Sequence, residues 1–201
     1  KVAAITEFIS VAIHAINRFD SLAHKKRNTI GIWGDGSLAY SVASVLKEMH
    51  PSSKIVVIGK HRSKLSNFSF VEKTYMVDYL PDNFEVDHAF ECTGGEGSYY
   101  AIDEIIRHIA PQGTVALMGV TENEVPVYTR DILEKGLTFV GCSRSGRSDF
   151  EQAIEIMENK HVQNRLSTII SYEGAVTSIS EIHEVFRKDM AAPFKTVFKW
   201  E

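Results

Sequence analysis

Three small residues at fixed spacing, Gly34, Gly36 and Ala39, carry the most specific chemistry in this sequence. The first glycine permits a tight turn, the second lets the backbone approach a ligand closely, and the small third residue allows a helix to pack near a strand. The turn lies between a short apolar run and a helical stretch, where the free N–H groups of a helix start favour an anion. We therefore predict that Gly34, Gly36, Ser37 and Leu38 hold the pyrophosphate of a dinucleotide.

The end of the next apolar run indicates which dinucleotide binds. NAD-binding forms usually carry an acidic residue there, about 20 residues further on, to accept hydrogen bonds from the ribose 2'-hydroxyl. This sequence has Gly59 at that place, followed by Lys60, His61 and Arg62. Gly59 leaves room for a 2'-phosphate, and Lys60 and Arg62 can pair with its charge. The sequence predicts NADP(H), and the alternative is that the basic run is an ordinary solvated loop.

Two further segments end apolar runs in the same way. Cys92, Thr93 and Gly94 follow one run, and Gly119 and Val120 follow another. Ligands of parallel sheets bind at the carboxyl ends of strands, so we expect the first segment beside the adenosine half and the second beside the nicotinamide ring. We interpret Cys92 as a packed residue and not as a nucleophile, because no base is identifiable next to it.

Alternating strands and helices must position these residues. Parallel neighbours need a crossover of about a dozen residues, usually helical. The alternation therefore predicts an α/β fold of Rossmann type, with a doubly wound, six-stranded parallel sheet. The expected strands are 29–33, 54–58, 73–77, 86–91, 113–120 and 137–141, and the expected helices between them are 37–49, 63–68, 99–109 and 129–134.

The two ends of the chain do not fit this alternation. An amphipathic helix, with apolar positions at helical spacing from residue 5 to 16, precedes the first strand. After a helix to residue 159, we expect a strand at 166–171, a helix at 180–189 and a strand at 195–199. We divide the chain into a leading helix from another domain (1–24), an NADP-binding Rossmann domain (25–160) and a return to that other domain (161–201). We expect the chain to be a piece of a longer protein.

Composition excludes several classes of function. The net charge of -4 gives no electrostatic reason to bind nucleic acid, and we interpret Lys25-Lys26-Arg27 as a solvated loop. Apolar runs such as 54–58 and 114–120 fall short of the ~20 residues of a membrane span, so we expect no membrane partner. The two cysteines belong to no Cys-x-x-Cys pair and no spaced Cys/His set, so the chain alone holds no complete structural zinc site. Free buried thiols favour a cytoplasmic location.

The sequence resembles the medium-chain zinc-dependent alcohol and polyol dehydrogenases over essentially its whole length. This resemblance implies a catalytic domain upstream and a catalytic zinc, for which Glu7 occupies the place of a glutamate ligand. The alternative for Glu7 is an acidic residue that merely favours the first turn of its helix. The stretches that carry the resemblance are 7–15, 34–36 and 86–95.

A narrower likeness is to the branch of this family that reduces ribulose 5-phosphate to ribitol 5-phosphate with NADPH. It implies a phosphorylated sugar substrate and a cytidylyltransferase partner that makes CDP-ribitol for teichoic acids or capsules. The alternatives are another NADP-dependent polyol or alcohol dehydrogenase, and a non-catalytic NADP-sensing Rossmann module. The stretches behind this likeness are 31–36, 64–66, 68–71, 87–92 and 133–138.

The loop after the sixth strand completes the expected site. The resemblance implies that backbone groups there, at Ser143, contact the nicotinamide carboxamide. Arg144 and Arg147 can reach a phosphate of substrate or cofactor, or they can be solvated. The family resemblance also implies a homodimer that pairs through the sixth strand, a point on which the sequence itself is silent.

Overall fold

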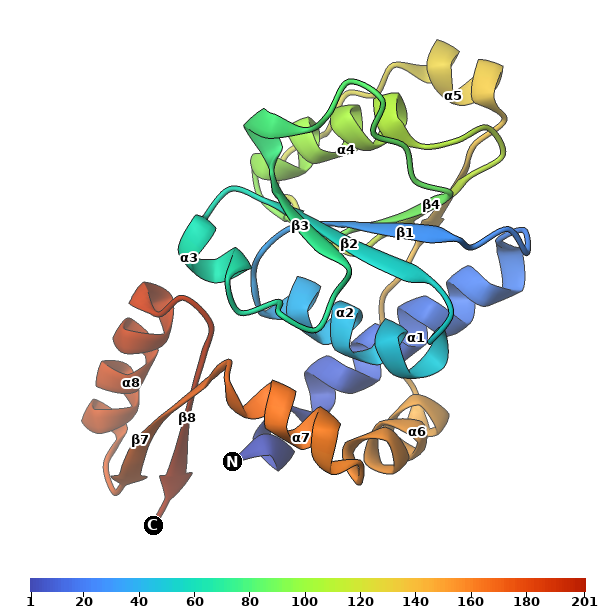
Figure 1. The fold of residues 1–201 in the computed structure, drawn as a ribbon. Helices are drawn as coiled ribbons and strands as arrows, with labels where there is room; N and C mark the ends of the chain where they lie inside the picture. The colour runs from blue at the N-terminus through green and yellow to red at the C-terminus, as the bar shows by residue number, and fades with distance from the viewer.

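The computed structural model describes all residues from Lys1 to Glu201. Its centre is one six-stranded parallel sheet in the order β3-β2-β1-β4-β5-β6 (Figure 1), which confirms the predicted fold class. The order reverses between β1 and β4, and this is the point where sheets of this kind bind ligands. The strands are β1 (Thr29–Trp33), β2 (Lys54–Gly59), β3 (Lys73–Met76), β4 (His88–Glu91), β5 (Thr114–Leu117) and β6 (Thr138–Gly141).

Helices cover both faces of the sheet, as a parallel sheet requires. In Figure 1, α4 (Gly97–His108) and α5 (Thr129–Lys135) lie on one side, and α1 (Thr6–Leu22) and α2 (Ser37–Met49) lie on the other. Side chains of β2 alternate between the two layers: Ile55 and Val57 join the α1–α2 core, while Val56 and Ile58 join the α4 core. The short α3 (Arg62–Leu65), η1 (Val2–Ile5) and η2 (Val77–Tyr79) complete this part of the fold.

The C-terminal part contains α6 (Arg147–Met157), α7 (Lys160–Ser167), β7 (Ile170–Val176), α8 (Ile179–Ala191) and β8 (Lys195–Trp200). β7 and β8 form a separate two-stranded parallel sheet, beside which α8 lies (Figure 1). The predicted strand at 166–171 was wrong at its start, because Leu166 belongs to α7. Val162, Leu166 and Ile169 are spaced as one helical face and are all buried, so packing favoured the helix there. The three-part division of the chain stays a prediction.

The expectation for the basic run 25–27 needs revision. The Lys25-Lys26-Arg27 run is not a simple solvated loop, because Lys26 Nζ pairs with Asp87 at 2.8 Å and Arg27 pairs with Asp20 and is only 18% exposed.

Residues Val2–Leu22 are, by length and composition alone, long and apolar enough to cross a membrane, although 44% of the most apolar part is buried inside the protein. Its apolar face packs against α2 and α6.

Candidate cofactor-binding site

Three adjoining cavities follow the carboxyl ends of the central strands. The first, of about 930 Å³, lies over β2, β1 and β4. The second, of about 370 Å³, shares Gly36 and Thr93 with the first, and the third, of about 600 Å³, shares Gly119 and Val120 with the second. Because neighbouring cavities share lining residues, we describe the three together as one groove across the switch point of the sheet.

The predicted glycine turn lies at the middle of this groove. Gly34 has a φ of +133°, and a Cβ there would meet the carbonyl oxygen of Cys92 at 2.7 Å, so no other residue fits without strain. A Cβ at Gly36 would meet nothing within 4 Å, which leaves open space in front of the turn. Ser37 and Leu38 line the second cavity at the start of α2. The predicted pyrophosphate residues are therefore brought together.

The start of α2 is available to an anion. No side chain caps this helix, and its N-cap residue is Gly36. The starts of α1, α3, α4 and α5 likewise lack a side-chain cap, whereas Ser178 caps α8, Asn159 caps α7, and Asp149 binds the Gly146 N–H at the start of α6. The first N–H groups of α2 therefore keep their capacity to bind a negatively charged ligand. This uncapped start, the open space at Gly36 and the shape of the groove fit a dinucleotide.

The end of β2 is organised by a residue that the sequence analysis did not single out. Asp35 is 9% exposed, and its Oδ2 accepts hydrogen bonds from the backbone N–H groups of Lys60 at 2.8 Å and His61 at 2.7 Å. A Cβ at Gly59 would lie 2.6 Å from the Cβ of Asp35. Gly59 is thus required by its packing against Asp35, a reason different from the room for a phosphate that the sequence suggested.

Basic side chains reach the first cavity from this loop. Lys60, His61 and Lys64 line it, and Lys64 also lines the second cavity. Arg62, which was predicted to pair with a 2'-phosphate, is not among the lining residues. It lies at the start of α3 and its role stays a prediction.

Glu91 links the loops after β4 and β5. The carboxylate is 1% exposed, and Oε1 accepts hydrogen bonds from the Thr93 N–H and the Ser98 hydroxyl, both at 2.9 Å. Oε2 accepts the Gly119 N–H at 2.9 Å. A Cβ at Gly119 would lie 2.5 Å from Oε2, so the glycine is needed for this approach. One buried carboxylate therefore sets the distance between the two loops.

The remaining predicted residues of these loops lie at the groove. Cys92, Thr93 and Gly94 line the second cavity, and Val120 is 83% exposed there. Burial is the main cause that raises the pKa of the Cys92 thiol well above its usual range, and the negative charge of Glu91 adds to it. A raised pKa favours the neutral thiol, which agrees with a packed role for Cys92.

The third cavity holds two charged side chains of opposite sign. Glu7, in the first turn of α1, lines it together with Ser143 and Arg144. Arg144 has a φ of +67°, an uncommon conformation for a residue other than glycine. Glu7 and Arg144 form no ion pair with each other. Arg147 does not line this cavity, and its Nε pairs with Glu151 at 2.7 Å.

A metal site is not complete within this chain. No group of three or more His, Cys, Asp or Glu side chains is placed to hold a metal ion. Glu7 is the only such side chain at the third cavity apart from the buried Cys142 thiol. Burial raises the pKa of Cys142. The residues present do not fit a zinc centre by themselves.

Two of the organising residues carried different signals in the sequence. Glu91 ends a buried apolar strand, and a charge in such a place indicates a partner that neutralises or hydrogen-bonds it. Asp35 gave no signal, because the middle residue of the glycine turn is free to vary in the pattern. Its partners lie 25 and 26 residues further along the chain, a contact that only the fold creates.

Comparison with known proteins connects this groove to one family. Residues 76–159 match the family described as zinc-binding dehydrogenase. The chain is 54% identical over 200 residues to ribulose-5-phosphate reductase of Streptococcus pneumoniae and 45% identical over 202 residues to that of Bacillus spizizenii. Both matches cover 100% of this chain, but only 58% of the Streptococcus protein and 59% of the Bacillus protein. The chain thus spans less than two thirds of the curated relatives it matches.

A solved structure gives the same picture. The crystal structure of S. aureus TarJ in complex with NADPH is 42% identical in sequence, and superposes with a TM-score of 0.94. The match covers 100% of this chain and 64% of that one. The fold of the whole chain, including α8 and the β7–β8 sheet, is therefore shared with a protein that binds NADPH.

Proposed function

We propose that this chain belongs to the medium-chain zinc-binding dehydrogenases and is the cofactor-binding part of an enzyme that reduces D-ribulose 5-phosphate to D-ribitol 5-phosphate with NADPH. The observation that carries the proposal is the continuous groove, in which an uncapped helix start lies between a cavity with basic side chains and a cavity with Glu7 and Arg144. The groove offers places for the adenosine, the diphosphate and the nicotinamide in that order.

The residues of this chain would orient the cofactor. The start of α2 would bind the diphosphate, and the loops held by Glu91 would place the nicotinamide ribose over Gly119 and Val120. NADPH supplies a hydride to the carbonyl carbon of the sugar when bound. Ser143, after β6, would contact the carboxamide through its backbone. Orientation and exclusion of water are the contributions expected of this domain.

A zinc ion in the whole protein is part of the proposal. Glu7 would be one ligand, and the others would come from residues outside this chain. When bound in the whole protein, zinc would supply a Lewis acid for the carbonyl oxygen of the substrate. Because the chain offers no complete metal site, we expect the 201-residue chain alone to be inactive.

Arg144 is the residue we propose for the phosphate of the substrate. It is the only cation that lines the third cavity, whereas Arg147 is 91% exposed and paired with Glu151. The guanidinium group binds phosphate in a bidentate manner. The left-handed backbone at residue 144 costs about 1 kcal/mol or more, and such strain is typical of functional positions.

The test is turnover by the intact protein. NADPH oxidation with ribulose 5-phosphate should yield ribitol 5-phosphate, and Arg144→Ala should raise the KM for the sugar phosphate roughly tenfold or more without raising that for unphosphorylated ribulose. Arg147→Ala is the matched control and should leave both constants unchanged. A wild-type protein that reduces no pentulose phosphate but reduces another polyol would favour the second candidate, a different polyol dehydrogenase. NADPH binding without any turnover would favour a sensing module.

Three further expectations belong to this proposal. The product would be used by a cytidylyltransferase partner to supply CDP-ribitol for teichoic acid or capsule synthesis, in the cytoplasm. We also expect a homodimer. The support for it is that β6 is an edge strand of the sheet, with backbone groups free to pair with a second copy.

A further inference from the structure

The carboxylate of Asp35 lies between the glycine turn and the end of β2. Its Oδ2 accepts the N–H groups of Lys60 and His61, and the Nδ1 of His61 lies 3.0 Å from the same oxygen. The Oδ1 atom lies 3.3 Å from that ring nitrogen. Both backbone N–H groups after β2 are thus tied to one buried side chain, which fixes the start of the basic loop.

The same side chain fills the space in which an acidic residue at position 59 would begin. A Cβ at Gly59 would meet the Cβ of Asp35 at 2.6 Å and its Oδ2 at 2.9 Å. Real Cβ atoms do not approach other atoms so closely, so Asp35 and a side chain at position 59 exclude each other. An acid at that place is the usual means of binding the ribose of NADH.

We propose that Asp35 is the positioning residue that sets the preference of this groove for NADPH over NADH. It does so by holding Lys60 and His61 at the wall of the first cavity and by keeping position 59 free of a carboxylate. The proposal rests on the proposed function only in taking a nicotinamide dinucleotide as the ligand of the groove.

Two opposing effects of the Asp35 charge must be weighed. A carboxylate near a 2'-phosphate repels it, but the side chain is only 10% exposed and its Oδ2 faces two N–H groups and an imidazole. These donors compensate the charge within the protein. Removing the carboxylate would leave two N–H groups without their acceptor and free the loop, and this loss outweighs the relief of repulsion.

The first experiment measures equilibrium binding of NADPH, NADH, 2',5'-ADP and 5'-ADP to the intact protein by calorimetry. Asp35→Ala should weaken NADPH and 2',5'-ADP roughly tenfold or more, and should change NADH and 5'-ADP much less. Asp35→Asn, which keeps one acceptor oxygen, should fall between Ala and wild type. Asp82→Ala is the control, since Asp82 is an exposed carboxylate that lines none of the three cavities, and it should not change the ratio of the two affinities.

Three other results of this titration would contradict either the role of Asp35 or the proposed function. An equal loss for both cofactors would overturn the proposal, because Asp35 would then only support the glycine turn. Tighter NADPH binding by Asp35→Ala would also overturn it, because repulsion would then be the larger effect. Wild-type protein that binds neither cofactor would contradict the proposed function instead.

The second experiment exchanges the two residues. Gly59→Asp alone should bind both cofactors poorly, because the new side chain collides with Asp35. The double variant Asp35→Gly, Gly59→Asp removes the collision with Asp35 and leaves only the end of the Leu65 side chain, 2.9 Å from the new Cβ, to shift. It should bind NADH at least tenfold more tightly than Gly59→Asp does. Circular dichroism and thermal melting of all variants serve as the folding control. Equal NADH affinity in the single and double variants would contradict the exclusion of position 59 by Asp35.

Discussion

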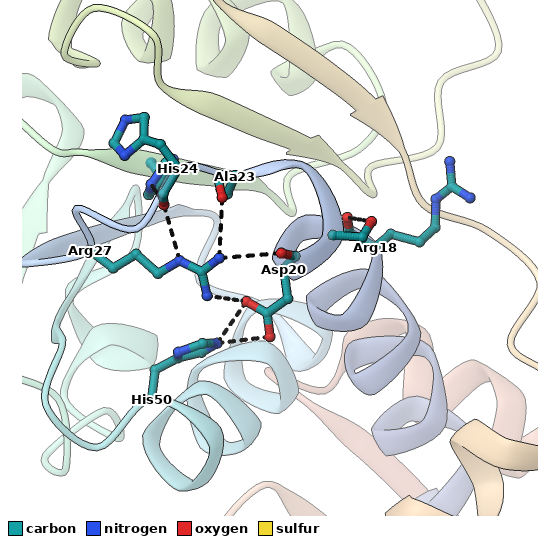
Figure 2. A network of polar contacts seen from close by, with 8 residues as sticks. Arg18, Asp20, Ala23, His24, Arg27 and His50 are labelled. Atoms are coloured by element: carbon teal, nitrogen blue, oxygen red, sulfur yellow. Dashed lines mark hydrogen bonds and ion pairs between the residues drawn. The ribbon is translucent and has the colours of Figure 1, made fainter.

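Polar side chains are used in opposite ways at the two ends of the strands of the central sheet, which we call the amino edge and the carboxyl edge. At the amino edge, Asp20 pairs with Arg27 and with His50 Nε2 at 3.1 Å, and Arg27 Nε also donates to the His24 carbonyl at 3.2 Å (Figure 2). At the carboxyl edge, Asp35 and Glu91 bind backbone N–H groups of loops. At the amino edge, the polar side chains bind one another and neighbouring backbone groups, so we call it the closed edge. At the carboxyl edge, the two carboxylates hold loops around the groove, so we call it the open edge.

His88 illustrates the closed character of the amino edge. It is fully buried at the start of β4, its Nδ1 accepts the Thr114 N–H at 3.0 Å, and its Nε2 faces the His24 carbonyl at 3.3 Å. Phe19 packs edge-on against the ring with a centroid distance of 5.0 Å. Both ring nitrogens of His88 therefore have a partner inside the protein. At the other edge, the start of α2 has no side-chain cap and lies at the second cavity, so its N–H groups stay available to a ligand.

Loss of the Glu91 carboxylate should have the largest effect, because it removes the organiser of the open edge. Glu91→Ala leaves three backbone N–H groups and the Ser98 hydroxyl without their acceptor. We expect the free energy of unfolding to fall by roughly 3 to 5 kcal/mol and cofactor affinity to fall with it. Urea denaturation of the intact protein measures the first, and NADPH titration the second.

Glu91→Gln is the control for this change. The amide has the same shape but turns one N–H₂ group toward an N–H donor, so we expect a smaller loss than in Glu91→Ala. A Glu91→Ala variant with wild-type stability would show that the two loops do not depend on this carboxylate.

Acid should act on the closed edge. Burial, with a smaller contribution from His24, lowers the pKa of His88 from 6.5 to about 4. Between these two values, the unfolded chain takes up a proton that the folded protein refuses, so stability falls as the pH drops from 6.5 to 4. The loss amounts to at most about 3 kcal/mol and is absent above pH 6.5.

The matched variant is His88→Gln, which offers a donor and an acceptor without titrating. The difference in unfolding free energy between wild type and this variant should shrink as the pH falls through that window. A difference that stays constant from pH 7 to pH 4 would mean that His88 is not the acid-sensitive group. Lys26 and Asp87, Asp20, Arg27 and His50 face the same region and are unchanged in both proteins.

The smallest effect should come from Asp20→Asn at the same edge. Asp20 is 30% exposed, so solvent screens its pairs with Arg27 and His50. Arg27 also keeps its position over the Phe19 ring, 4.9 Å from the centroid. We expect a loss of about 1 kcal/mol in urea denaturation and no change in NADPH affinity. A large drop in cofactor affinity would show that the two edges are coupled.

Local patterns were enough to predict the open edge in outline. The spacing of Gly34, Gly36 and Ala39, together with the apolar runs, predicted the sheet and a turn that does lie at the cavities, and the position of a pyrophosphate there stays a prediction. The same reasoning missed the packing of Gly59 against Asp35, because Asp35 lies 24 residues earlier in the chain. The Lys25-Lys26-Arg27 run was also misjudged. Lys26 pairs with Asp87, which directly precedes β4, and Arg27 pairs with Asp20 on α1. A local sequence pattern does not show which distant residue will pair with a charged side chain once the chain has folded.

The most direct test of the central claim is the ratio of the dissociation constants of NADPH and NADH for the intact protein, measured by equilibrium titration at fixed ionic strength. From the basic side chains at the open edge, we predict that NADPH binds at least about tenfold more tightly than NADH. It also predicts that Lys60→Ala removes most of this preference. Equal or tighter binding of NADH by the wild-type protein would contradict the assignment of the groove to NADPH.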